Sequence, residues 1–205
     1  MKRTKAAIHK IVKEKYSQAA LTVEGCCSAP SACQTPMPIN IMDLSKRCGY
    51  TEDQLNSELS KANLGLGCGN PLSLAGLKPG ERVLDLGSGP GFDAFLAAQA
   101  VGETGYVIGV DMTQEMARSA HGTARETGRK NVAFILGEIE NLPVGGSCVD
   151  FVLSNCVINL SHSKKAVYRE IFRVLRPGGR MVISDVLRSG EIPEKIRKDP
   201  AAYSG

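Results

Sequence analysis

A glycine-rich loop and a cysteine are the two features of this sequence that could carry chemistry. The stretch VLDLGSGPGFD runs from an apolar segment into glycines at positions 87, 89 and 91, so the backbone there can approach a bound ligand closely. The stretch SNCVINL places Cys156 directly after another apolar segment, with no acid, histidine or lysine inside it. A thiolate at such a place prefers a soft, thiophilic atom. The alternative is a buried thiol that only packs at the end of a strand.

The spacing of the glycines discriminates between cofactors. A dinucleotide-binding loop needs its third glycine five positions after the first, but Phe92 stands there and the pattern is G-x-G-x-G. Asp111 ends the next apolar segment, twenty residues beyond Gly91, where a carboxylate can accept both hydroxyl hydrogens of a ribose. Farther on, GEIENLP offers Glu138 and backbone groups to an adenine edge. The set argues against a nicotinamide cofactor, although the loop alone could be a tight turn and Asp111 alone a helix cap.

Short apolar runs alternate with helical stretches from Glu81 onwards. The expected strands are RVLDLG, GYVIGVD, NVAFILG, VDFVLSN and RMVISDV, separated by helices near 92–101, 113–127 and 164–175. This alternation is typical of an α/β fold with a doubly wound, mostly parallel sheet that helices cover on both faces. On the last helix, Val167, Ile171 and Leu175 form one apolar stripe. Ligands of such folds bind at the carboxyl edge of the sheet, where Cys156 is expected.

The first 75 residues follow a different pattern. Apolar residues recur at helical spacing from Lys5 to Ala20, which indicates an amphipathic helix. Residues 24–50 lack periodicity and are expected to form a loop with at most a short strand or turn, and a Thr cap with early acids predicts a helix over 51–62. The glycines and proline of NLGLGCGNP then leave Cys68 in a loop. We expect an N-terminal helical and cysteine-containing extension over 1–75, a core domain over 76–190 and the start of a further region over 191–205.

Composition and charge exclude several classes of protein. The 205 residues are 42% apolar and 22% charged, with no apolar run of about 18 residues and no signal-peptide pattern, so we expect a cytoplasmic protein without membrane contact. The net charge is +4, and the first 20 residues hold six Lys or Arg against one Glu. We interpret them as a solvated helix face rather than as a nucleic-acid surface. Seven cysteines without a C-x-x-C pair favour buried thiols or soft ligands over a zinc site.

The motifs, taken in order, closely resemble those of arsenite S-adenosylmethionine methyltransferases, a family of class I methyltransferases. The resemblance covers roughly residues 16–205 and rests on LGLGCGNP, DLGSGPGFD, GVDMT, GEIENLPV, SNCVINLS and FRVLRPGGRMVISDV. It implies a Rossmann-like core with the strand order 3-2-1-4-5. It also implies S-adenosylmethionine-dependent methylation of trivalent arsenic (arsenite or methylarsenite), whose lone pair attacks the methyl group. Such an attack needs no deprotonation, which explains the missing base.

The resemblance also assigns roles to individual residues. Cys68 and Cys156 correspond to catalytic cysteines that hold arsenic, and Cys26 or Cys27 to a third cysteine that binds arsenic or takes part in the redox cycle. A thiol reductant of the glutathione or thioredoxin type is implied as a partner. The remaining cysteines are expected to be exposed or packing thiols: Cys33, Cys48 and Cys148. The expected cofactor-binding residues are Asp85, Gly87, Ser88, Gly89, Gly91, Asp93, Asp111, Met112, Gly137, Glu138, Ile139 and Asn155.

Within that set, Asn155 and Cys156 are expected to face the methyl group. Asp85 and Asp93 have an alternative role as carboxylates that order the loop or cap the helix.

The sequence departs from the family near its end. The family continues through a WGEC-like segment with a further arsenic-binding cysteine and through two more strands, whereas this sequence reads DPAAYSG and stops at Gly205. We therefore expect a chain that is truncated relative to the family, whether cropped, encoded by a shortened reading frame or completed by a second chain. Two other functions stay open here. One is methylation of a small organic acceptor with a structural Cys156, and the other is a non-catalytic, thiol-based metalloid-binding module.

Overall fold

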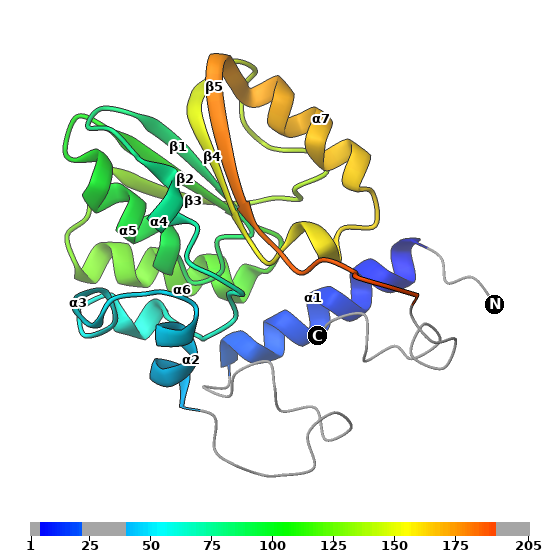
Figure 1. The fold of residues 1–205 in the computed structure, drawn as a ribbon, viewed down its shortest axis with the longest axis horizontal. Coiled ribbons are helices and arrows are strands. Elements are labelled where there is room, and N and C mark those ends of the chain that lie inside the picture. Colours follow the sequence, from blue (N-terminus) through cyan, green and yellow to red (C-terminus); the bar gives the residue numbers. More distant parts are fainter. Residues whose placement is uncertain (1–4, 22–39, 192–205) are drawn as a thin grey trace.

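The computed structural model describes residues 5–21 and 40–191 of the chain. Five parallel strands form one sheet in the order β3-β2-β1-β4-β5 (Figure 1). Their bounds are Arg82–Leu86 for β1, Tyr106–Asp111 for β2, Val132–Leu136 for β3, Val149–Asn155 for β4 and Leu175–Ser184 for β5. The doubly wound α/β class and the strand order predicted from the sequence are confirmed.

Helices cover both faces of the sheet. One face packs against α4 (Leu72–Ala75), α5 (Phe92–Val101) and α6 (Gln114–Glu126), and the other packs against α7 (Lys164–Val174). Side chains of β1 alternate between these faces, Val83 packing with α5 and Leu84 with α7, as the two-residue period of a strand requires. Two apolar layers therefore enclose the sheet and fix where its strands end.

The start of β5 differs from the prediction. Val167 and Ile171 of α7 are buried as expected, but Leu175 does not extend that helical stripe. It pairs with Val149 and begins β5, and the regular ladder resumes only at Arg180 opposite Phe151. The Pro-Gly-Gly segment between them occupies an irregularity in the ladder, which a pattern of apolar residues does not reveal.

The N-terminal part contains α1 (Lys5–Leu21), α2 (Ile41–Arg47), α3 (Glu52–Leu55) and the short 3-10 helix η1 (Ser60–Ala62). The first of these was predicted. The prediction of a single helix over 51–62 was wrong, since α3 and η1 are separate. Between them, Ser57 Oγ donates to the Gln54 carbonyl and accepts from the Leu59 amide, and these bonds take the place of helical hydrogen bonds. The prediction of a loop over 24–50 was wrong where α2 forms; the Asn40 side chain caps the start of this helix. Residues 24–39 of that loop lie outside the described residues.

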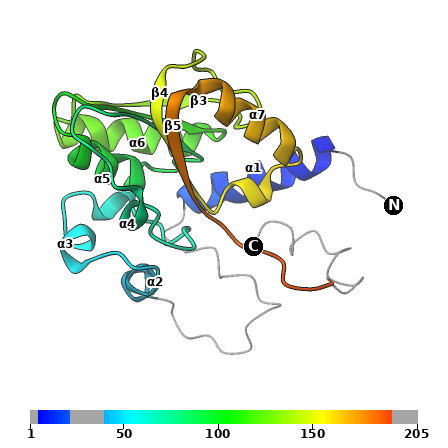
Figure 2. The same cartoon turned by 45° about the horizontal axis from the view of Figure 1, so that its top comes forward.

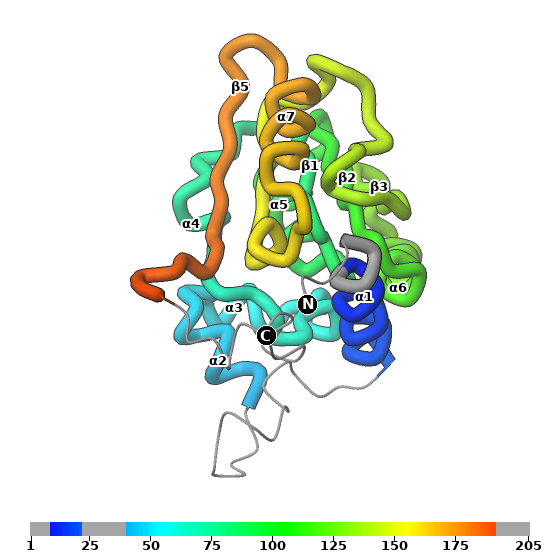
Figure 3. The backbone as a smooth tube through the Cα atoms, turned by 90° about the vertical axis from the view of Figure 1, so that its right-hand side faces the viewer, coloured from blue at the N-terminus to red at the C-terminus, as the bar shows by residue number. Residues whose placement is uncertain are grey.

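The N-terminal helices gather at the end of the sheet where the strands end (Figures 1 and 2). There α1 packs beside α6 (Figure 3). No helix among the described residues is long and apolar enough to cross a membrane. The extension and the sheet thus meet at the edge where the sequence predicts the site.

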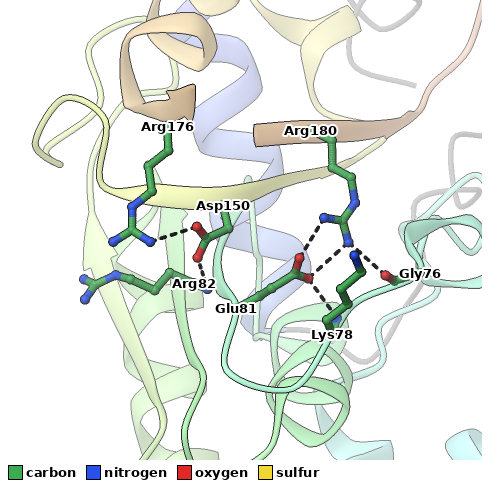
Figure 4. Close-up of polar contacts among 7 residues, drawn as sticks. All are labelled: Gly76, Lys78, Glu81, Arg82, Asp150, Arg176 and Arg180. Atoms are coloured by element: carbon green, nitrogen blue, oxygen red, sulfur yellow. Dashed lines mark hydrogen bonds and ion pairs between the residues drawn. The ribbon is translucent and has the colours of Figure 1, made fainter. Parts of the chain in front are cut away.

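Ion pairs hold the strands together near the opposite end of the sheet (Figure 4). Glu81 accepts hydrogen bonds from both terminal nitrogens of Arg180, at 2.7 and 3.1 Å. Asp150 accepts from Arg176 and from the Arg82 amide, both at 2.8 Å. These contacts tie β1 to β4 and β5 away from the pocket described next.

Candidate functional site

A pocket opens at the carboxyl ends of β1, β2, β3 and β4, where open α/β sheets bind ligands. Its wall combines the loops after these strands with residues of α1 and of the segment 44–67. Cys156 lines this wall. Of the residues predicted to bind a cofactor, those that also line it are Asp85, Gly87, Ser88, Gly89, Asp93, Asp111, Met112, Gly137, Glu138, Ile139 and Asn155.

The glycine loop leads from β1 into α5 with three glycines in left-handed conformations. Their φ angles are +63° at Gly87, +52° at Gly89 and +96° at Gly91. Among the described residues, the nearest atom to a β-carbon on Gly89 would be Met116 Sδ at 3.9 Å, whereas one on Gly91 would lie 2.5 Å from Phe134 Cζ. Gly91 is also absent from the pocket wall. Gly89 therefore leaves space beside the pocket, while Gly91 serves the packing of α5 against β3.

Three carboxylates line the pocket close to one another: Asp85, Asp93 and Asp111. Asp85 is 2% exposed, and its Oδ2 atom has no hydrogen-bond partner among the described residues. Burial raises the pKa of all three carboxyls, and the charges of Asp93 and Asp111 raise the pKa of Asp85 further. Because a buried carboxylate without a partner is costly, this part of the pocket suits a cationic group.

Asp111 ends β2 and joins the glycine loop to the start of α6. Its Oδ2 accepts from the Gly89 amide at 2.9 Å, and its Oδ1 accepts from the amide and the hydroxyl of Thr113 at 2.9 and 2.8 Å. Burial is the main cause that raises the pKa of Asp111, and these bonds oppose it. The helix cap that the sequence left open for Asp111 is not formed in that way, because Thr113 is the N-cap residue of α6 and Asp111 bonds to the amide and hydroxyl of Thr113 itself. The binding of Asp111 to a ribose stays a prediction.

Two cysteines from distant loops lie together beside the pocket. Cys156 follows β4 with a φ of +58°, a left-handed conformation that is uncommon for a residue with a side chain. Cys68 is exposed, and its Sγ lies 3.9 Å from Ser184 Oγ at the end of β5. A hydrogen bond from Cys156 is the main cause that lowers the pKa of Cys68 to about 7. Burial opposes this shift and Ser184 adds to it. The thiolate of Cys68 is therefore easier to form than that of an ordinary cysteine.

The other cysteines differ in their relation to the pocket. Cys48 packs against the core, as expected, but it also lines the pocket and donates to the Gly67 carbonyl at 3.5 Å. Cys148 donates to the Gly145 carbonyl at 2.9 Å and is not part of the wall. Within the described ranges, no group of three or more His, Cys, Asp or Glu side chains is arranged to hold a metal ion. The N-terminal cysteines lie outside the described residues: Cys26, Cys27 and Cys33.

Sequence reasoning missed a polar group at the Glu138 side of the pocket. His9 of α1 places Nε2 3.2 Å from Glu138 Oε1, and His162 places Nδ1 3.0 Å from Glu140 Oε1. The two imidazole rings meet edge to face with centroids 6.5 Å apart. Only three histidines occur in the chain, so their scarcity was the one available signal.

The chain is similar to arsenite methyltransferases over nearly its whole length. It is 45% identical to one of Halobacterium salinarum over 202 residues, which make up 95% of this chain and 51% of that protein. It is 36% identical to one of Aquipseudomonas alcaligenes, over 96% of this chain and 56% of that protein. The chain thus spans about half the length of the curated relatives it matches.

The fold and the sequence agree on the wider family. An arsenic (III) S-adenosylmethionine methyltransferase from Chlamydomonas reinhardtii is a similar solved structure, with a TM-score of 0.63 and 42% identity over 77% of this chain and 53% of that one. A family described as methyltransferase domain matches residues 77–205. That match takes in all five described strands and more than half of the sequence. The chain therefore belongs to the methyltransferase-domain family.

Proposed function

We propose that this chain catalyses S-adenosylmethionine-dependent methylation of trivalent arsenic held by Cys68 and Cys156. The observation that carries the proposal is that both cysteines meet at Ser184 beside the pocket of a methyltransferase-domain sheet: Cys68 Sγ lies 3.9 Å from Ser184 Oγ, and the Cys156 amide donates to the Ser184 carbonyl at 2.7 Å. The similar proteins named as arsenite methyltransferases support it. The soft thiol pair, rather than the glycine loop, is what favours arsenic over an organic acceptor, because thiolates prefer soft ions.

The pocket residues fit the proposed cofactor. S-adenosylmethionine is cationic, and Asp85 offers a buried carboxylate oxygen that has no partner among the described residues. The space beside Gly89 suits close approach of the ligand to the backbone, and Asp111 at the end of β2 suits a ribose. When bound, the cofactor supplies an electrophilic methyl group. We assign the methionine end to Asp85, Gly87, Ser88 and Gly89, the ribose to Asp111 and Met112, and the adenine to Gly137, Glu138 and Ile139.

The work of the protein in this reaction is to hold and orient arsenic. Trivalent arsenic bound to thiolates carries a lone pair and has no proton to lose, so no general base has to act on it. The thiolate is the form that binds soft ions, and the lowered pKa of Cys68 makes that form available near pH 7. Alignment of the lone pair with the methyl carbon then lowers the barrier.

Turnover calls for further groups. Transfer of a methyl cation to the lone pair takes arsenic from oxidation state +3 to +5, so a second round needs two electrons. We propose a thiol reductant of the glutathione or thioredoxin type as their source. We further propose Cys26 or Cys27 as the third thiol or redox partner, and residues 1–75 as a cap over the site. Cytoplasmic placement and a contribution from a C-terminal segment or a second chain complete the proposal.

The direct test of this assignment is binding of As(III) to the purified chain and to two variants, Cys68→Ser and Cys156→Ser. Because each variant removes one of two soft ligands, we expect its dissociation constant for As(III) to rise at least about tenfold. Equilibrium dialysis with arsenic quantified by mass spectrometry measures this.

Cys148→Ser is the matched control, since that thiol donates to the Gly145 carbonyl away from Cys68 and Cys156, and its affinity should equal that of the wild type. Unchanged affinity in both Cys68→Ser and Cys156→Ser would contradict the assignment.

A further inference from the structure

Asn155, the last residue of β4, connects three separate segments of the chain through its side-chain amide. Its Oδ1 accepts from the Cys68 amide at 3.1 Å. Its Nδ2 lies 2.9 Å from the Gly69 carbonyl and 2.9 Å from Asp93 Oδ2, and donates to both. Asn155 thus hydrogen-bonds to the backbone on both sides of the Cys68 side chain and connects this loop to Asp93 in the first turn of α5.

The orientation of this amide is fixed by its partners. A carbonyl and a carboxylate oxygen lie on the Nδ2 side and can only accept, so the oxygen must face the Cys68 amide. Tyr50 reinforces the arrangement, because its hydroxyl donates to Asp93 Oδ1 at 2.6 Å and lies 3.1 Å from Asn155 Nδ2. Tyr50 is itself 7% exposed, which shields the network from water.

The glycines on either side of Cys68 allow the loop to approach Asn155 closely enough for these hydrogen bonds. A β-carbon on Gly67 would lie 2.7 Å from Asn155 Nδ2, and one on Gly69 would collide with Ser184 Oγ. The Gly-Cys-Gly loop therefore lies flat against the ends of β4 and β5, and Cys68 is the one residue of the three that carries a side chain.

We infer that Asn155 is a positioning residue for the thiol pair, which docks the Cys68 loop on the end of β4 so that Cys68 and Cys156 present their sulfur atoms to one ligand. Asp93 and Tyr50 act through Asn155 by fixing its amide. This inference deepens the proposed function and rests on it for the identity of the ligand. It changes the expected role of Asn155 from binding the cofactor to orienting a cysteine.

The test compares Asn155→Ala with the wild type in two assays. Dibromobimane joins two nearby thiols with loss of two bromides, so the rate of Cys68–Cys156 cross-linking reports their juxtaposition without arsenic. We expect that rate to fall about fivefold or more, because a released loop lowers the effective concentration of one thiol at the other. We also expect As(III) affinity to fall about tenfold, as is common when a group that orients a ligand residue is lost, while S-adenosylmethionine affinity stays within about twofold.

Asn131→Ala is the matched control, because that amide is likewise part-buried and donates to the backbone, to the carbonyls of Ala98 and Gly102, but precedes β3 at the opposite end of the sheet from the thiols. It should leave both assays unchanged. If Asn155→Ala does not fold, Tyr50→Phe replaces it as the test variant in the cross-linking assay. It removes only the hydroxyl and keeps the ring packed on Phe92, and a cross-linking rate lower by about twofold or more is expected.

The inference would be overturned if Asn155→Ala, or Tyr50→Phe in its place, cross-linked Cys68 to Cys156 as fast as the wild type. Equal losses of As(III) affinity and S-adenosylmethionine affinity would also overturn it. Failure of the proposed function looks different. In that case the wild type cross-links Cys68 to Cys156 faster than Asn155→Ala does, yet binds no As(III).

Discussion

Cys68 and Asp85 are shifted away from their ordinary ionisation in directions that suit two different ligands. The hydrogen bond from Cys156 lowers the pKa of Cys68 to about 7 and favours the thiolate, which binds soft ions. Burial raises the pKa of Asp85, as do the charges of Asp93 and Asp111, so its charge is unfavourable until a cation offsets it. At the residue scale, a neighbouring thiol is the main cause of the first shift and loss of water is the main cause of the second.

The first prediction concerns the reactivity of Cys68. Cys156→Ala removes the main cause that lowers the pKa of Cys68, so that pKa should rise from about 7 toward the ordinary thiol value of 9.0. Less thiolate at pH 7 means slower alkylation, by at least about threefold. Peptide-level mass spectrometry after iodoacetamide treatment measures the rate, with Cys148 in the same chain as the reference. Equal rates for Cys68 in variant and wild type would refute the stated cause.

The second prediction concerns Asp85, whose Oδ2 atom has no hydrogen-bond partner in the described part of the chain. Asp85→Asn replaces a buried ionisable group with a neutral one. Without ligand, the variant should therefore have an unfolding free energy about 1–3 kcal/mol larger than that of the wild type near pH 7, and a higher unfolding temperature. Because the folded-state pKa of Asp85 is raised above its unfolded value of about 4, the wild type loses stability as pH rises above that value. The advantage of the variant should therefore be larger at pH 8 than at pH 4.

Calorimetry at both pH values measures this advantage, and titration with S-adenosylmethionine should show weakened binding in the same variant. A destabilised variant that still binds the cofactor normally would contradict the role given to Asp85.

At the scale of elements, the loops after the strands and helices depend on glycines for two separable reasons. Gly91 has a φ of +96° and lies directly against Phe134. Gly102, at the end of α5, has a φ of +68°, and no atom of the described residues would lie within 4 Å of a β-carbon there. The first glycine is needed for its conformation and for close packing, and the second for its conformation alone.

The third prediction uses this contrast. Gly102→Ala should cost about 1 kcal/mol of unfolding free energy, from backbone strain. Gly91→Ala should cost about 3 kcal/mol, because steric overlap with Phe134 adds to the strain. Urea denaturation of both variants gives the two values. Equal losses of unfolding free energy in the two variants would contradict this prediction, because they would show that Phe134 can move away from a β-carbon at position 91 at little cost.

At the scale of the whole molecule, the sheet and the edge of the pocket could be predicted from the sequence. Short apolar runs such as VDFVLSN, which alternate with helical stretches along the chain, are typical of buried parallel strands, and glycines mark where some of these strands turn into loops. Asp111 and Cys156 follow such runs directly, so their place at the carboxyl edge follows from the parallel fold. The docking of Cys68 beside Cys156 agrees with the resemblance to arsenite methyltransferases, which linked these residues before any contact was known.

What could not be predicted is the set of contacts between segments far apart in the chain. Tyr50 and His9 line the pocket because α1 and the segment after α2 fold across the strand ends, and no local pattern encodes that meeting. The helix expected over 51–62 was wrong because Ser57 forms its own hydrogen bonds with the backbone. The early start of β5 depends on a pairing with Val149 across an irregular ladder.

The measurement that tests the central claim most directly is mass spectrometry of arsenic species after incubation of the purified chain with As(III), S-adenosylmethionine and a thiol reductant. The account predicts methylated arsenic from the wild type and none from Cys68→Ala or Cys156→Ala, with S-adenosylmethionine binding intact in all three. A wild type that binds S-adenosylmethionine but yields no methylated arsenic, or a Cys156→Ala variant that yields as much as the wild type, would contradict it.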